Sequence, residues 1–175
     1  MKWIKRIFVC LLVLFIVLWV VVKSTTKYTT GKELKRLFTE NENDFRRAAQ
    51  VLTDVLSNNK DTISISSIST SKYSGDIPND RFVVEQLNDL YFLSYNTYSQ
   101  EDYILMYDAV DVLFSSLEIE GVAVANEQIY FCISSYAGIV SDIIYRSDDE
   151  QPFVLHTVKE QIKISDGWYI VISHD

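Results

Sequence analysis

Residues 154–173 read VLHTVKEQIKISDGWYIVIS, and this stretch indicates how the second half of the chain folds. Before Asp166 the apolar residues Ile162 and Ile164 alternate with polar ones. The dipeptide Asp166-Gly167 is the kind that most strongly predicts a two-residue turn between antiparallel strands. The sequence therefore predicts a hairpin with strands 154–165 and 168–173.

The hairpin has a predicted register, and two apolar segments are predicted to be interior strands of a sheet. A two-residue loop pairs Ser165 with Trp168, because those residues flank the turn directly. Residues 129–133 and 168–172 are apolar at every position, as in strands that are covered on both faces. With this register, one face of the hairpin is predicted to carry Ile162, Ile164, Tyr169 and Val171.

Earlier segments supply more strands and three helical stretches. Strands are predicted at 63–65, 119–124, 128–136 and 139–146. Apolar residues at helical spacing predict helices at 31–56, at 82–93 and at 99–117. The first of these is one helix, or two with a break in 40–44. Capping signals support the starts: Thr30 with Glu33, Asn41 before the second half, and Ser99 with Asp102. The third helix is expected to bury Tyr103, Tyr107, Val110, Phe114 and Leu117.

Helices followed by an antiparallel β-meander define an α+β fold class. We expect residues 31–175 to form a single soluble α+β domain. The order of elements is similar to the NTF2-like or cystatin-like plan, in which a bent sheet wraps a helix. This resemblance concerns element order over most of residues 31–175, and no specific motif carries it.

Residues 7–22 predict a transmembrane helix. They read IFVCLLVLFIVLWVVV, sixteen apolar residues without charge, Gly or Pro. Sixteen residues reach only about 24 Å, short of the roughly 30 Å hydrocarbon core. The span therefore extends toward 3–23 at its limits, with long basic stems reaching the headgroups. The predicted flanks of the anchor are Lys5, Arg6, Trp19 and Lys23.

The anchor has an alternative interpretation as a cleaved signal peptide. No Ala-x-Ala pair follows the apolar run, and residues 23–30 read KSTTKYTT. These features favour a permanent signal-anchor with a short basic flank at 1–6 and a linker at 23–30. Basic residues lie on both sides of the run, so the two flanks favour opposite membrane orientations. We expect a cytoplasmic N-terminus and an extracytoplasmic C-terminal domain.

Charge is unevenly distributed along the chain. Residues 1–59 hold 10 Lys and Arg against 5 Asp and Glu, and residues 60–175 hold 6 against 19, which together give the formal net charge of −8. A basic region beside the membrane suits anionic headgroups. The acidic remainder argues against nucleic acid as a partner. No Asn-x-Ser/Thr sequon occurs, which favours a bacterial origin.

The sequence carries no recognisable catalytic, cofactor-binding or metal-binding pattern. His156 and His174 are the only histidines, and their spacing does not fit a metal site. Cys132 lies in an apolar run and is predicted to be a buried, inert thiol, and it cannot pair with Cys10 in the membrane segment. Asp148-Asp149-Glu150 lacks the ligand spacing of a calcium loop and is predicted to face solvent. The protein is therefore expected not to be an enzyme.

Tyrosines next to carboxylates mark one candidate protein-binding surface. Six tyrosines fall between residues 73 and 107, among several acidic residues. Tyrosine rings add contact area at low entropic cost, which suits binding surfaces. The alternative is that most of these rings belong to the core. The candidate surface consists of Tyr95, Tyr98, Glu101 and Asp102.

Three functions are compatible with these observations. The first is a single-pass membrane-anchored, non-enzymatic accessory domain that binds another protein at the bacterial cell surface. The second is an immunity-type antagonist of a basic toxin, steered by the acidic face. The third is an enzyme or small-ligand carrier with a pocket in a curved sheet, lined by Tyr130, Tyr145 and Trp168.

Overall fold

The computed structural model describes residues 8, 11–15, 30–57, 62–67, 83–136, 138–154 and 156–174. Its helices are α2 (Gly31–Glu40), α3 (Glu42–Leu56) and α4 (Gln100–Leu117). Its strands are β1 (Ile63–Ser66), β2 (Val83–Leu87), β3 (Leu90–Ser94), β4 (Gly121–Ala125), β5 (Gln128–Tyr136), β6 (Ile139–Arg146), β7 (Thr157–Ser165) and β8 (Trp168–His174). The predicted α+β class is confirmed.

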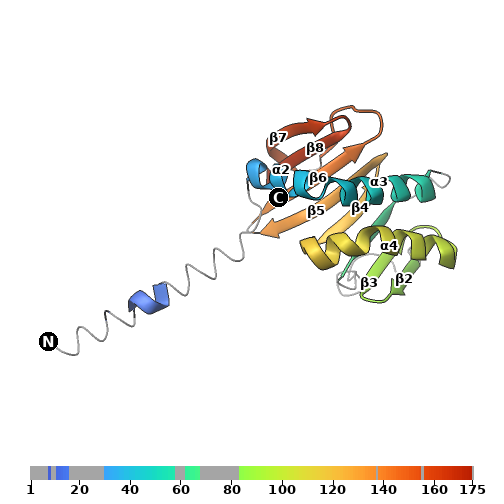
Figure 1. Cartoon of the computed structure of the whole chain (residues 1–175), viewed down its shortest axis with the longest axis horizontal. Helices are drawn as coiled ribbons and strands as arrows, with labels where there is room; N and C mark the ends of the chain where they lie inside the picture. The colour runs from blue at the N-terminus through green and yellow to red at the C-terminus, as the bar shows by residue number, and fades with distance from the viewer. Residues whose placement is uncertain are drawn as a thin grey trace.

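The strands form one antiparallel sheet in the order β2-β3-β1-β4-β5-β6-β8-β7. This is more than a meander, because β1 lies between β3 and β4 although β2 and β3 follow it in the sequence. Figure 1 shows α2, α3 and α4 on one face of the sheet. The core lies between the helices and that face, and at its centre the Trp168 ring lies 4.9 Å from Phe38 and 6.0 Å from Phe131.

Two of the three predicted helix starts have the expected caps. The Thr30 side chain accepts from the Glu33 N–H, and the Glu33 carboxylate accepts from the Thr30 N–H. Ser99 and Asp102 form the same reciprocal pair at α4. The third cap prediction is wrong, because the Asn41 side chain makes no N-cap bond and instead donates to the Leu37 carbonyl at 2.9 Å. Asn41 therefore closes α2 and sets the break before α3.

Gly31 fixes the start of α2 against the edge of the sheet. A Cβ on Gly31 would lie 2.5 Å from Ile162 Cδ1 and 2.9 Å from a Glu160 carboxylate oxygen. Any larger residue here would require the ends of the Ile162 and Glu160 side chains to move. The domain therefore begins beside the β7 edge of the sheet.

The predicted helix at 82–93 is wrong, because this stretch forms β2 and β3. Leu87 pairs with Leu90 across a two-residue turn, in which Asn88 has a φ of +52°. Asn tolerates this left-handed conformation better than most residues. Leu90 and Phe92 on β3 are buried against the helices.

The predicted register of the last hairpin is correct only at its turn. Ser165 pairs with Trp168, as expected, but an irregularity between Lys163 and Ser165 leaves an extra residue in β7. Ile162 therefore pairs with Ile170 and faces the helices, on the side opposite to Val171. A bulge of one residue moves the side chains beyond it to the other face.

The described residues include no helix that meets the length and hydropathy needed to cross a bilayer. Within the predicted span, Phe8 and residues 11–15 are helical, and their apolar side chains are 51–69% exposed. The rest of residues 7–22 lies outside the described residues, as do Lys5, Arg6, Trp19 and Lys23. The transmembrane helix therefore stays a prediction.

Candidate functional site

The four residues of the predicted tyrosine surface differ in their exposure. Tyr95 is 54% exposed and Glu101 is exposed. Tyr98 is only 6% exposed, with its ring edge-on to Tyr103 at 5.8 Å. Asp102 is used as the cap partner of Ser99. Tyr98 is therefore a core residue, and its predicted place on the surface is wrong.

A different apolar surface lies on the outer side of α4. Ile104 and Leu105 are 43% and 47% exposed. Residues spaced by three and four lie on one side of a helix, so Glu101 and Asp108 flank this pair one turn away on either side. The helix also buries residues the sequence pattern did not select: Met106 and Leu113 are fully buried, whereas the predicted Tyr107 and Phe114 are half-buried.

We call Glu101, Ile104, Leu105 and Asp108 the α4 surface. The sequence pattern did not predict the α4 surface, because a single inward-facing stripe assigns every apolar residue of the helix to the core. The signal was the excess of apolar residues: besides the buried stripe, α4 has Ile104, Leu105 and Val112. An amphipathic helix with one buried face does not need them.

The segment that contains the α4 surface carries charge of one sign. Residues 82–145 contain ten Asp and Glu and neither Lys nor Arg. This segment includes β2, β3, α4, β4 and β5. The Tyr107 hydroxyl donates to Asp111 at 3.2 Å and lies 3.4 Å from an Asp89 oxygen, which links α4 to the β2–β3 turn. Two exposed apolar side chains thus lie in a segment of the chain whose charged residues are all acidic.

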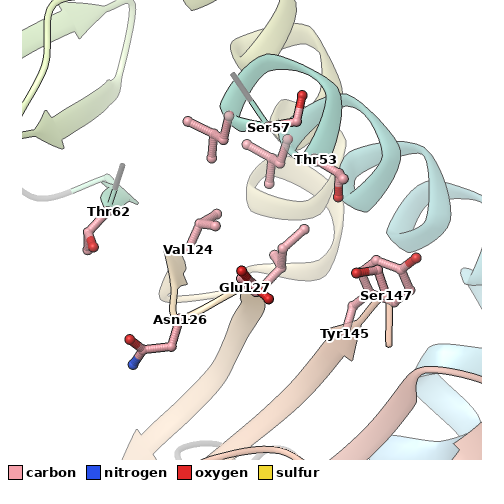
Figure 2. A pocket seen from close by; sticks show the side chains of 11 residues that line it. Thr53, Ser57, Thr62, Val124, Asn126, Glu127, Tyr145 and Ser147 are labelled. Atoms are coloured by element: carbon pink, nitrogen blue, oxygen red, sulfur yellow. The ribbon is translucent and has the colours of Figure 1, made fainter. Parts of the chain in front are cut away.

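A cavity of about 450 Å³ opens between the end of α3 and the β4–β5 turn. Figure 2 shows side chains from α3, from that turn and from the end of β6 around it. Tyr145 lines the cavity, as the small-ligand hypothesis predicted. The other two predicted rings do not, because Trp168 is buried beneath the helices and Tyr130 lies on the opposite face of the sheet.

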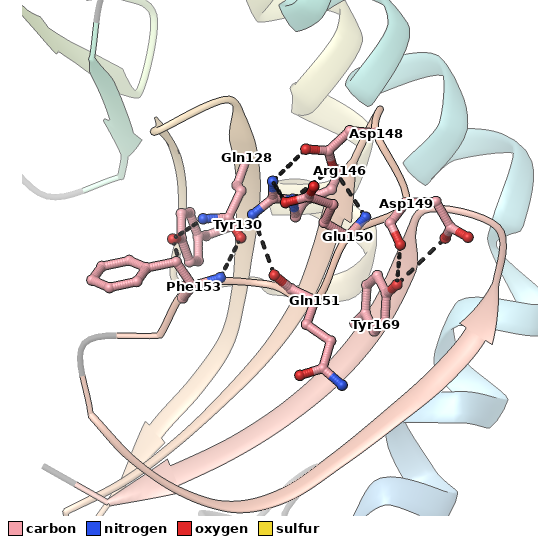
Figure 3. Close-up of polar contacts among 9 residues, drawn as sticks. All are labelled: Gln128, Tyr130, Arg146, Asp148, Asp149, Glu150, Gln151, Phe153 and Tyr169. Atoms are coloured by element: carbon pink, nitrogen blue, oxygen red, sulfur yellow. Dashed lines mark hydrogen bonds and ion pairs between the residues drawn. The ribbon is translucent and has the colours of Figure 1, made fainter.

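Tyr130 instead helps to hold the segment that joins β6 to β7. Its hydroxyl donates to the Phe153 carbonyl at 2.9 Å, and the Phe153 N–H donates to the Gln128 side chain at 2.7 Å. Figure 3 shows this segment folded back across the ends of β5, β6 and β8. It covers the face of the sheet that the helices leave open, where Ile144 and Val171 are fully buried.

The acidic turn at 148–150 is more than a solvent-facing turn. The Arg146 guanidinium binds Asp148 through Nε and Nη2. Asp149 accepts from Lys163 Nζ at 2.5 Å and from the Gly167 N–H at 2.6 Å. Hydrogen bonding from Arg146 lowers the pKa of Asp148 to about 2. Asp149 therefore fastens the segment to the β7–β8 hairpin, and Asp148 binds it to the end of β6.

No catalytic constellation forms among the residues that the structure describes. Burial raises the pKa of the Cys132 thiol, so the thiol is protonated and a poor nucleophile. The described histidines, cysteine and carboxylates do not come together in a group suited to a metal ion. Cys132 is only partly buried, and the inert thiol stays a prediction that the raised pKa supports.

No match to the chain is found among protein-family models, curated proteins or solved structures. Function is therefore argued from the surfaces themselves.

Proposed function

We propose that this protein is a membrane-anchored, non-enzymatic domain that binds another protein through the α4 surface. The observation that carries this proposal is the exposure of Ile104 and Leu105 between Glu101 and Asp108. Apolar side chains surrounded by polar ones are typical of binding surfaces, in which the apolar centre supplies most of the affinity.

The anchor in this proposal is the apolar run 7–22. Its described part is a helical stretch whose apolar side chains are more than half exposed. Water opposes such exposure and lipid does not. Because α2 starts at Gly31, only residues 23–30 separate the run from the domain. We propose a cytoplasmic N-terminus and a domain held close to the outer surface of a bacterial membrane. An NTF2-like or cystatin-like plan is proposed for that domain, supported by its single helix-covered face.

The partner in this proposal is a protein with an apolar patch and a basic rim. The absence of Lys and Arg from residues 82–145 supports this choice, because a basic rim would meet only acidic side chains there. An accessory subunit of a membrane assembly meets this description. A basic toxin meets it as well, and for that partner the protein would act as an immunity-type antagonist.

The test is recovery of bound protein from crosslinked native membranes. Replacing both Ile104 and Leu105 with Ser should lower the recovered partner at least about tenfold, because the apolar centre of the contact is lost. Gln50→Ala on the exposed side of α3 is the matched control and should change nothing. Salt at about 0.5 M should weaken recovery by the wild-type protein. Equal recovery by the double variant would show that the α4 surface is not the binding site.

A further inference from the structure

We propose that the cavity between α3 and the β4–β5 turn binds a small organic cation, in which an amine or quaternary ammonium group is attached to an apolar body. This site is separate from the α4 surface and does not depend on it. The proposal rests on three observations: the apolar walls of the cavity, the sign of its charge, and the backbone conformation of one residue.

The walls of the cavity suit the apolar body of such a ligand. Leu52 and Leu56 contribute from α3, Val124 and Ile129 from β4 and β5, and Tyr145 from β6. A volume of about 450 Å³ lies within the usual range for small-ligand sites. Six polar residues complete the lining, and Figure 2 shows Asn126 and Glu127 of the turn below Thr53 and Ser57 of α3.

The electrostatics of the cavity select a positive charge. Glu127 is the one charged side chain among the described lining residues. The C-terminal end of α3 also points here, since Thr53, Leu56 and the C-cap Ser57 line the cavity. A helix C-terminus carries partial negative charge, and the last turn of α3 has no basic residue to neutralise it. The Tyr145 ring adds a face that attracts cations.

Among the described residues, Arg146 is a cation on which the Glu127 charge acts. Of the influences that raise the Arg146 pKa, the hydrogen bond that Arg146 donates to Asp148 is the largest and the Glu127 charge is the smallest. Arg146 pairs with Gln128, on the sheet face opposite to Tyr145. Its guanidinium is already bound to Asp148 and reaches the Gln151 carbonyl at 3.2 Å. It therefore does not occupy the cavity.

The backbone at Glu127 is the third observation. Asn126 and Glu127 have φ values of +52° and +62°, so both residues of the turn are left-handed. Such two-residue turns favour Asn followed by Gly, because a side chain at the second position is strained. A glutamate here is costly for folding. Strain held at the opening of a cavity suggests that its carboxylate has a function.

The experiment uses benzylamine as the probe, with benzyl alcohol and benzoate as the neutral and anionic probes of similar size. The full chain in detergent micelles is titrated with each, and backbone amide NMR shifts are followed. Benzylamine should shift the amides of Asn126 and Tyr145 saturably, with a Kd at least about tenfold lower than that of benzyl alcohol. Benzoate should produce no saturable shift.

Substitutions then assign the charge. Glu127→Gln should weaken benzylamine binding at least about tenfold while leaving benzyl alcohol unchanged. Glu118→Gln is the matched control, because Glu118 is also acidic and left-handed, with a φ of +55°, but lies at the end of α4. Glu127→Gly should raise the melting temperature and also weaken benzylamine binding. These opposite effects would show that Glu127 contributes to binding and not to folding.

Three results would overturn the proposal. One is equal affinity for benzylamine and benzyl alcohol, which would make the cavity a purely apolar one. Another is an unchanged benzylamine Kd in Glu127→Gln. The third is amide shifts that do not saturate or that map away from the cavity, which would indicate partition into the micelle.

Discussion

Cys132 and Asp142 are cross-strand partners on the sheet face opposite the helices. Burial is the main influence on the pKa of both groups, and it raises the pKa of Asp142 to about 6 although the Cys132 thiol acts to lower it. Glu120 contributes in the same direction, and His156 opposes it. A carboxyl that is 8% exposed thus carries a charge at neutral pH with little solvation.

Asp142 should make the domain less stable as the pH rises. The pKa of Asp142 in the folded state is above the ordinary value, so the folded state holds the proton more tightly than the unfolded state. Stability therefore falls as the pH rises from about 4 to about 6. Asp142→Asn should remove this fall and raise the free energy of unfolding at pH 7.5 by about 3 kcal/mol. Urea unfolding at pH 4.5 and pH 7.5 measures it, with Asp108→Asn as the exposed control. An unchanged pH dependence in Asp142→Asn would contradict the assignment.

Asp148 should act in the opposite direction and at lower pH. Arg146 holds the pKa of Asp148 at about 2, below its ordinary value. The stabilisation is therefore complete above about pH 4 and is lost as the pH falls toward 2. Asp148→Asn should flatten the acid limb of the stability curve in this range, as followed by circular dichroism. Glu101→Gln, which lies far along the chain, should leave that limb as it is; identical acid limbs in all three proteins would show that the ion pair contributes nothing.

The aromatic cluster under the helices should dominate stability. Phe45 is fully buried, with its ring 5.2 Å from Phe131 and 6.4 Å from Trp168. Phe45→Ala should cost about 3–5 kcal/mol, because it removes buried area and leaves a cavity. Leu105→Ala, at a half-exposed position of the α4 surface, should cost roughly 0.5 kcal/mol or less. Chemical denaturation of both variants measures this difference, and comparable losses would mean that Leu105 is packed rather than exposed.

The cap of α4 offers a local test. Ser99 accepts from the Asp102 N–H at 3.1 Å. Ser99→Ala should destabilise the domain by about 1 kcal/mol, because a helix N–H loses its partner. Ser115→Ala, at an exposed position inside the same helix, should be neutral or slightly stabilising. Thermal unfolding distinguishes them, and a neutral Ser99→Ala would show that water replaces the cap.

The sequence predicted those strands and helices whose signals are local. The hairpin turn was predicted from Asp166-Gly167, and two helix starts were predicted from their capping boxes. The apolar run at 129–133 predicted a buried strand. Residues 82–93 failed because Val83, Leu87, Leu90 and Tyr91 also fit a helical spacing. The decisive feature was Asn88-Asp89, a two-residue turn whose left-handed Asn88 the periodicity does not reveal.

Features that depend on tertiary contacts were beyond the sequence. The extra residue between Lys163 and Ser165 reverses the side of Ile162, and no residue type in that stretch signals it. Tyr98 was expected at the surface because it lies among acidic residues, but it is buried with its ring against Tyr103, which in turn contacts Phe92. The cavity near Tyr145 is formed by segments far apart in the chain, and only their packing creates it.

Site-specific photocrosslinking in native membranes tests the central claim most directly. A photoreactive side chain is placed at position 105 on α4, and at position 50 on α3 in a second protein. The account predicts one discrete crosslinked protein of high isoelectric point from position 105 and none from position 50. Crosslinks only to lipid, or the same products from both positions, would contradict the claim that the α4 surface binds a basic protein.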